Sequence, residues 1–100
     1  PFLPAKSIFL AQLGNLAKRK SLKLFEDFRR AKIPAAESFS KDSLKTQLRA
    51  ADKTGADYAL ILGQKEALDE TIIIRDMKNG KQETVKLEKA VKEMQKRLKK

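Results

Sequence analysis

An uninterrupted apolar run at residues 58–62, YALIL, constrains the fold of this chain more than any other feature. The run is short, β-prone and apolar at every position, whereas a strand with one solvent-exposed face would alternate. It therefore predicts a central strand of an α/β sheet, buried on both faces. Gly63 follows the run and opens a polar connector that holds Gln64, Lys65 and Glu66. Because ligands of open α/β sheets gather outside the carboxyl ends of strands, this connector is a candidate binding site.

Strand and helix patterns alternate along the rest of the chain. A first helix is expected to begin with Asn15 as its N-cap, after a strand that Gly14 ends. It stops at Ile33-Pro34, because proline cannot donate a hydrogen bond to a helix and restricts the residue before it. The expected strands are residues 8–13, 35–39, 58–62, 71–77 and 82–86.

A second helix is expected after the second strand, with Ser40 or Asp42 as its cap and Gly55 just beyond its end. A third helix is expected at residues 87–98, where apolar residues recur at helical spacing. The buried side of the second helix is expected to hold apolar residues at i, i+4 and i+7, namely Leu44, Leu48 and Ala51.

The order of these elements is β-α-β-α-β-β-β-α. Helical connections make the first three strands parallel, with right-handed crossovers. The Asn79-Gly80 dipeptide predicts a hairpin with a type I′ turn, which adds antiparallel strands. The expected fold is therefore a single α/β domain over residues 1–100, with three α/β/α layers and a mixed five-stranded sheet with three helices.

Composition excludes several functions. The chain has no cysteine and no histidine, so disulfides, thiolate metal sites and histidine-based catalysis are excluded. We expect no catalytic, metal-binding or cofactor-binding residues, since neither GxGxxG nor GxxxxGK[ST] occurs. No apolar run approaches the roughly 20 residues of a membrane span, so no membrane association is expected. The missing initiator Met suggests a piece of a longer protein or a processed one.

The formal net charge is +10, from 23 Lys and Arg against 13 Asp and Glu. Such an excess suits a polyanionic partner, such as nucleic acid or an anionic membrane surface, but it also serves solubility. The clearest cationic pattern recurs every four residues along the expected second helix, at Lys41, Lys45, Arg49 and Lys53. A solvated helix face would show the same pattern, so charge alone leaves both interpretations open.

Position favours a binding role for this stripe. The start of the second helix and the ends of the first and third strands should meet at the carboxyl edge of the sheet. That arrangement would put Gln12, Gln64 and Glu66 beside Lys41 and Lys45. Polar side chains for base edges, flanked by lysines for phosphates, are the division of contacts that nucleic-acid recognition requires.

The segments IFLAQLG, SKDSLKTQLRAADKTGADYALILGQKEA and TIIIRDMKNGKQETV closely resemble the C-terminal anticodon-binding domain of bacterial histidyl-tRNA synthetases, which are class II aminoacyl-tRNA synthetases. The resemblance runs over residues 7–91. It implies a five-stranded mixed sheet with three helices that binds the tRNA anticodon stem-loop. It also implies that Glu66 and Arg75 approach anticodon bases, and that Lys41, with Asp42 and Ser43 beside it, does the same.

Taken with the sheet-edge argument, the resemblance gives a full set of expected tRNA contacts. The expected anticodon contacts are Glu66, Arg75, Lys41, Ser43, Gln12 and Gln64, and the expected backbone contacts are Lys45, Arg49 and Lys65. The resemblance also implies a cytoplasmic, homodimeric parent, a histidine–tRNA ligase that uses ATP and Mg on a separate catalytic domain. This chain alone is expected to be monomeric and without catalytic activity. A same-fold regulatory or RNA-binding module of a synthetase-like paralogue, and a basic protein-interaction domain, remain the alternatives.

Overall fold

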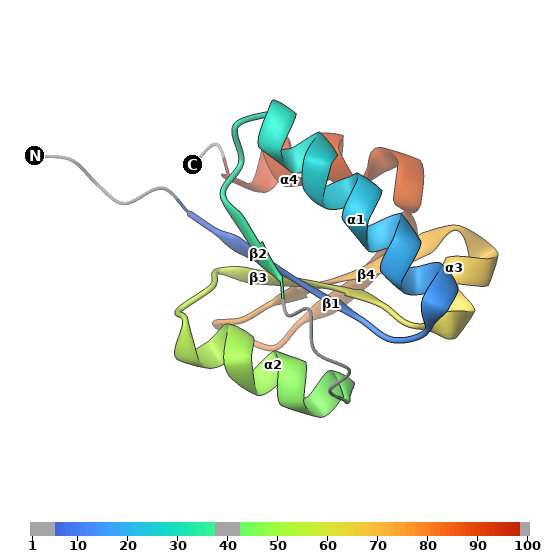
Figure 1. Ribbon diagram of the computed structural model, residues 1–100. Helices are drawn as coiled ribbons and strands as arrows, with labels where there is room; N and C mark the ends of the chain where they lie inside the picture. Colours follow the sequence, from blue (N-terminus) through green and yellow to red (C-terminus); the bar gives the residue numbers. More distant parts are fainter. Residues whose placement is uncertain (1–5, 38–42, 99–100) are drawn as a thin grey trace, which may run out of the picture.

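Five strands form one mixed sheet in a computed structural model that describes residues 6–37 and 43–98 (Figure 1). The strand order across the sheet is β2-β1-β3-β4-β5. The strands are β1 Ile8–Gln12, β2 Ala35–Glu37, β3 Tyr58–Leu62, β4 Thr71–Asp76 and β5 Gln82–Lys86. The helices are α1 Asn15–Arg30, α2 Leu44–Lys53, α3 Gln64–Asp69 and α4 Ala90–Leu98, with a 3-10 turn, η1, at Leu87–Lys89.

The sheet has the predicted connectivity. β1 pairs in parallel with both β2 and β3, and β3, β4 and β5 follow one another in antiparallel pairs. The apolar run at residues 58–62 forms β3, the middle strand of the five, and four of its five residues are buried. The predicted mixed five-stranded α/β sheet is therefore confirmed.

The described residues form four α-helices, not the predicted three, because the connector after β3 is the short helix α3. Gly63 is its N-cap, and the Glu66 carboxylate accepts a hydrogen bond from the Gly63 N–H at 3.0 Å. A six-residue helix has fewer than two turns, so its sequence shows no clear helical period.

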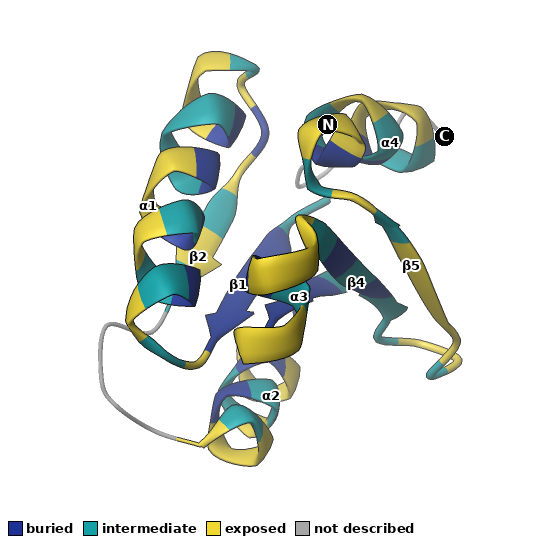
Figure 2. Cartoon of the chain, turned by 90° about the vertical axis from the view of Figure 1, so that its right-hand side faces the viewer, coloured by how far each residue is buried: buried dark blue, intermediate teal, exposed yellow. Residues whose placement is uncertain are grey.

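The helices cover the two faces unequally. Figure 1 shows α1 and α4 on one face of the sheet and α2 on the other, with α3 near the end of β3. The larger core lies under α1 and α4 and includes Phe28, Leu60, Ile74 and Met94. The core beneath α2 is small; its buried members in the described residues are Phe9, Ala51 and Ala56. Figure 2 shows β1 buried, whereas β5 is exposed over most of its length.

Several predicted element ends were wrong. Gly14, not Asn15, is the N-cap of α1, and it makes no side-chain cap. The helix then ends at Arg30, ahead of Ile33 and Pro34, because Lys32 adopts a left-handed φ of 61°. At α2 the cap is Ser43, whose Oγ accepts from the Thr46 N–H at 3.2 Å.

The predicted caps Ser40 and Asp42, and the strand residues 38–39, lie outside the described residues. Gly55 follows α2 with a φ of +74°, as predicted for the residue just beyond the helix. On α2 itself, Leu44 and Leu48 are only half-buried, whereas Gln47 and Ala51 are fully buried. The prediction therefore omitted Gln47, which is more buried than either leucine.

The β4–β5 hairpin exists, but the predicted type I′ turn was wrong. Such a turn needs a positive φ at both central residues, and Asn79 has none. Asp76 closes a longer loop instead: its N–H donates to the Lys81 carbonyl at 2.9 Å, and its carboxylate accepts from the Lys78 N–H at 2.9 Å. Gly80 supplies the one positive φ in the loop, +75°.

Candidate nucleic-acid interface

The carboxyl ends of β1 and β3 lie level, as predicted. Gln12 is in register with Leu62, and the Leu13 N–H donates to the Leu62 carbonyl at 3.1 Å. The loops after these strands also touch: a Cβ atom at Gly14 would lie 2.9 Å from Cγ of Gln64. The structure therefore brings the Gln64 side chain over the end of β1, at the edge where we expected a site.

Glu66 also lies at this edge, where its side chain has a structural role. Its side chain is half-buried, and one carboxylate oxygen bonds the Gly63 N–H. A Cβ at Gly63 would lie only 2.8 Å from that oxygen, so the carboxylate fits closely against the backbone. A base contact by Glu66 would thus come from a carboxylate that is already held in place.

Gln12 fits its predicted role poorly. The residue is only 6% exposed, so it offers little surface to a base. Its backbone N–H and carbonyl are both bonded by the side chain of Gln47. Gln64 and Lys65, by contrast, are exposed at the start of α3.

The cationic residues of α2 point away from the sheet. Lys45, Arg49 and Lys53 are exposed, on the helix side opposite Gln47 and Ala51. None of the three takes part in an ion pair within the described parts of the chain. Their charge is therefore available to an anionic partner.

Two further predicted residues lie at the start of this helix. The Ser43 hydroxyl caps α2 and also lies 3.1 Å from Oγ1 of Thr46. It is exposed, so a ligand can still reach it. Lys41, which we expected to contact the anticodon, lies outside the described residues.

Arg75 is on the α2 side of the sheet but far from Glu66. Its neighbour Ile74 is buried in the core under α1 and α4, and side chains alternate along a strand, so Arg75 faces the other way. Arg75 pairs with Ala59, near the start of β3, whereas Glu66 follows its end at Leu62. Three residues of strand, about 10 Å, separate these levels, so the two residues would meet different parts of a ligand.

Arg75 also has a partner that we did not predict. Its Nη1 donates to Oε1 of Gln82, directly opposite on β5, at 2.9 Å. The guanidinium extends toward the hairpin loop, because its Nη2 lies 3.5 Å from the Cβ position of Gly80. The only described helix on this side of the sheet is α2, which packs on β1 and β3. Arg75 therefore stands on a part of the sheet that no described helix covers.

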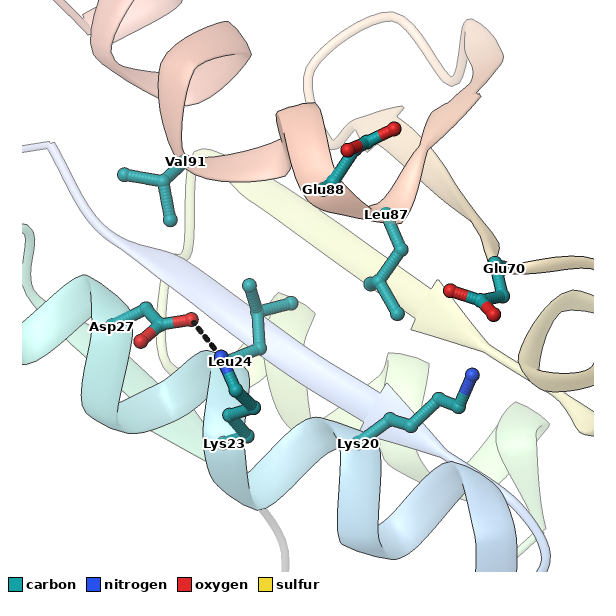
Figure 3. Close-up of a pocket in the computed structure, with 8 residues that line it drawn as sticks. All are labelled: Lys20, Lys23, Leu24, Asp27, Glu70, Leu87, Glu88 and Val91. Carbon is teal, nitrogen blue, oxygen red and sulfur yellow. Dashed lines mark hydrogen bonds and ion pairs between the residues drawn. The ribbon is translucent and has the colours of Figure 1, made fainter.

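The other side of the molecule has a different electrostatic character. A cavity of about 380 Å³ lies between α1 and the η1–α4 segment, with Lys20 and Lys23 on its α1 wall (Figure 3). Glu70 and Glu88 line it from other elements, and Lys23 forms an ion pair with Asp27 at 3.5 Å. Because both signs of charge line this cavity, it suits a polyanion less well than α2 does.

Part of the charge of α1 is neutralised in the same way. Glu26 forms ion pairs with Arg29 and, at 4.0 Å, with Arg30. The hydrogen bond from Arg29, together with the charges of both arginines, holds the pKa of Glu26 below its usual value. Lys18, Arg19 and Lys20 of α1 take part in none of the ion pairs of the described residues, so α1 also offers unpaired charge. We prefer α2 as the candidate for an anionic ligand because none of its three cations is paired within the same residues.

The described residues contain no group of acidic, histidine or cysteine side chains that would hold a metal ion. Over the same residues, no helix is long and apolar enough to cross a membrane. Gln47 and Gln82 are the two residues at this interface that the sequence did not reveal. Gln47 had one signal, since it lies three residues after Leu44 and four before Ala51, on the buried stripe.

Comparisons with known proteins agree on one family. A family model described as an anticodon binding domain matches residues 8–97. The chain is 38% identical over 98 residues to the histidine–tRNA ligase of Dehalococcoides mccartyi strain 195, and 40% identical over 85 residues to that of Syntrophotalea carbinolica. It covers 98% and 85% of its own length in these matches, but only 23% and 20% of the two relatives.

Solved structures give the same result. The histidyl-tRNA synthetase of Staphylococcus aureus matches with a TM-score of 0.82 and 27% identity, over 89% of this chain and 26% of that one. The enzyme from Nostoc sp. PCC 7120 matches with a TM-score of 0.80 and 29% identity, over 96% of this chain and 23% of that one. The RNA binding domain of a Cryptosporidium parvum threonyl-tRNA synthetase shares the fold, with a TM-score of 0.81 at 14% identity.

Proposed function

This chain belongs to the anticodon binding domain family, and we propose that it binds the anticodon stem-loop of histidine tRNA. The observation that carries the proposal is the set of uncompensated cations on α2, next to the polar edge formed by the ends of β1 and β3. The domain would act by positioning: it holds the anticodon so that the acceptor end reaches a catalytic domain elsewhere in the parent protein.

The proposed contacts divide by chemistry. Lys45, Arg49 and Lys65 are exposed cations and would neutralise backbone phosphates. Gln64, Glu66 and Arg75 carry groups that hydrogen-bond base edges, and Lys41 and Ser43 would act at the start of α2. Gln12 is the weakest candidate of the set, because it is buried beneath the sheet edge and offers little surface to a base.

The separation of Glu66 from Arg75 would set the path of the bound RNA across the sheet. A strand that meets both residues would run along the uncovered side of β4, from α3 toward the β4–β5 hairpin. The two side chains would then read different nucleotides, and substitutions in them would affect different anticodon positions.

The parent would be a cytoplasmic, homodimeric histidine–tRNA ligase that uses ATP and Mg on its catalytic domain. Within it, residues 1–100 would form one domain, monomeric when isolated. A paralogue of the same fold with a regulatory role would share the RNA contacts but lack aminoacylation. Aminoacylation of histidine tRNA by the full-length parent separates these two versions of the proposal.

The RNA contact itself is tested by salt dependence. The dissociation constant of the anticodon stem-loop is measured over a range of salt concentrations for the wild-type chain and for Lys45→Ala/Arg49→Ala. Each lost phosphate contact lowers the slope of log affinity against log salt by about 0.7–0.9, so the double variant should lose roughly 1.4–1.8. Lys92→Ala/Lys96→Ala, which removes two exposed lysines of α4, is the matched control and should keep the wild-type slope.

Two results would overturn the proposal. One is a wild-type chain that binds the stem-loop no more tightly than a lysine-rich peptide of equal charge, which would favour a basic protein-interaction domain. The other is an equal loss of slope in both double variants, which would show that only net charge matters.

A further inference from the structure

Gln47 is a buried polar residue at the junction between the proposed RNA-binding helix and the sheet. It lies in the middle of α2 and is only 1% exposed. Its side-chain amide bonds both polar backbone groups of Gln12: Oε1 accepts from the N–H at 2.9 Å, and Nε2 donates to the carbonyl at 2.6 Å. One side chain thus joins α2 to the last residue of β1.

These two bonds lie on the β2 side of β1. On the β2 side of β1, the Ile8 N–H donates to the Pro34 carbonyl at 3.1 Å. Gln12 lies four residues further along β1, so its N–H points to the same side. The described part of β2 ends at Glu37, which pairs with Leu10. The Gln47 amide therefore bonds β1 on its β2 side, two residues beyond Leu10, the β1 residue that pairs with Glu37.

The anchor matters because apolar packing holds α2 only lightly. Among the residues that the structure describes, the buried members of the α2-side core cluster are Phe9, Ala51 and Ala56, two of which are alanines. The core on the other face contains larger side chains, including Phe28, Leu60 and Met94. On α2 itself the one fully buried apolar residue is Ala51, whereas Leu44 and Leu48 are half-buried, so side-chain interlock does little to fix its position along the sheet. The Gln47 bonds supply the direction and register that this small core lacks.

We propose that Gln47 is a positioning residue for RNA binding: by bonding the backbone of Gln12, it fixes the placement of α2 and its cations relative to the sheet edge. The inference rests on the proposed function. Ser43 lies one turn before Gln47, and Lys45 and Arg49 flank it on the outward side of the same helix. A shift of α2 would therefore move these residues together relative to Gln64 and Glu66, although a substitution of Gln47 removes none of the side chains proposed to contact RNA.

The test must separate this role from a simple contribution to stability. Gln47→Met keeps the length of the side chain but removes both hydrogen bonds, and Gln47→Asn keeps the amide but is too short to reach both groups. Ser21→Ala is the matched control: Ser21 is also buried, at 2% exposure, and it donates to Glu37 at 2.7 Å from α1 on the opposite face. All four proteins are compared under conditions where circular dichroism shows each of them folded.

We expect Gln47→Met to weaken binding of the stem-loop at least tenfold and to reduce the salt slope, with Gln47→Asn intermediate and Ser21→Ala within twofold of wild type. Amide hydrogen exchange should accelerate in α2 of the Gln47 variants and not in α1. If Gln47→Met does not fold, Gln47→Asn decides the test by the same comparison with Ser21→Ala.

Folded Gln47 variants that bind within twofold of wild type would overturn the inference, as would an equal loss in Ser21→Ala. In either case, a reduced salt slope in Lys45→Ala/Arg49→Ala would still support the proposed function. Failure of the wild-type chain to bind the stem-loop would instead overturn the proposed function itself.

Discussion

Glu66 has a structural role and a proposed role in base reading through the same carboxylate, and two substitutions separate them. Its Oε1 caps the start of α3 by accepting the Gly63 N–H at 3.0 Å. Glu66→Gln keeps an oxygen that accepts this bond, whereas Glu66→Ala removes it. Loss of such a cap costs about 1 kcal/mol, so only the Ala variant should lower the free energy of unfolding by that amount.

Base reading predicts that the two variants behave alike in anticodon discrimination, although they differ in stability. A carboxylate offers two acceptor oxygens and an amide offers one, so both variants should lose discrimination at one anticodon position. A specific base contact is worth about 1–3 kcal/mol, which corresponds to roughly 5–150-fold in relative affinity. Each protein variant is titrated with the wild-type stem-loop and with stem-loops that each carry one substituted anticodon base, and the affinities are compared. The free energy of unfolding is measured in urea.

Asp69→Asn is the matched control, since it removes one exposed carboxylate from the same helix. It should change neither stability nor discrimination. If Glu66→Gln discriminates among anticodon bases as well as the wild type does, Glu66 is a helix cap only and its assignment as a base reader is refuted.

Three further predictions concern stability and charge. Arg97→Met removes ion pairs with two glutamates and the contact of the guanidinium with the Tyr58 ring at 5.9 Å, and should lower the free energy of urea unfolding by about 1–2 kcal/mol. No loss beyond that of Lys96→Met would contradict this. Lys32→Gly relieves a left-handed φ of 61° and should stabilise the chain by about 0.5–1 kcal/mol, seen as a higher melting temperature; a lower one would refute it. Because the pKa of Glu26 is lowered, its ion pairs stabilise the fold above the ordinary carboxyl pKa of 4.5 and lose this effect as the pH falls through the lowered value. Carboxyl NMR titration should give a midpoint below 4.5 that rises in Arg29→Ala, and an unchanged midpoint would show that the pair does not form in solution.

The sheet was predictable because its signals are local and strong. The apolar run of β3 and the helical connections fixed three parallel strands, and Asn79-Gly80 located the hairpin. The helix α3 was missed because six residues are too few to show a period. The turn type was missed because the Asp76 side chain bonds the Lys78 N–H and favours a longer loop.

The candidate site was only partly predictable for a related reason. Its edge residues followed from strand order, so Gln64 lies, as expected, at the sheet edge where β1 ends. Gln47 was not, because its role depends on the backbone of Gln12, 35 residues away in sequence. The offset of about 10 Å between the strand levels of Glu66 and Arg75 likewise depends on antiparallel register, which the sequence alone does not specify.

The most direct test of the central claim is a map of the RNA-binding surface. The anticodon stem-loop is titrated into ¹⁵N-labelled protein, and backbone amide shifts are followed by NMR. We predict the largest shifts in α2, at residues 63–66 and along β4–β5, with α1 and α4 nearly unchanged. Largest shifts on α1 and α4, around the cavity of mixed charge, would contradict the claim that the RNA docks on the α2 side of the sheet.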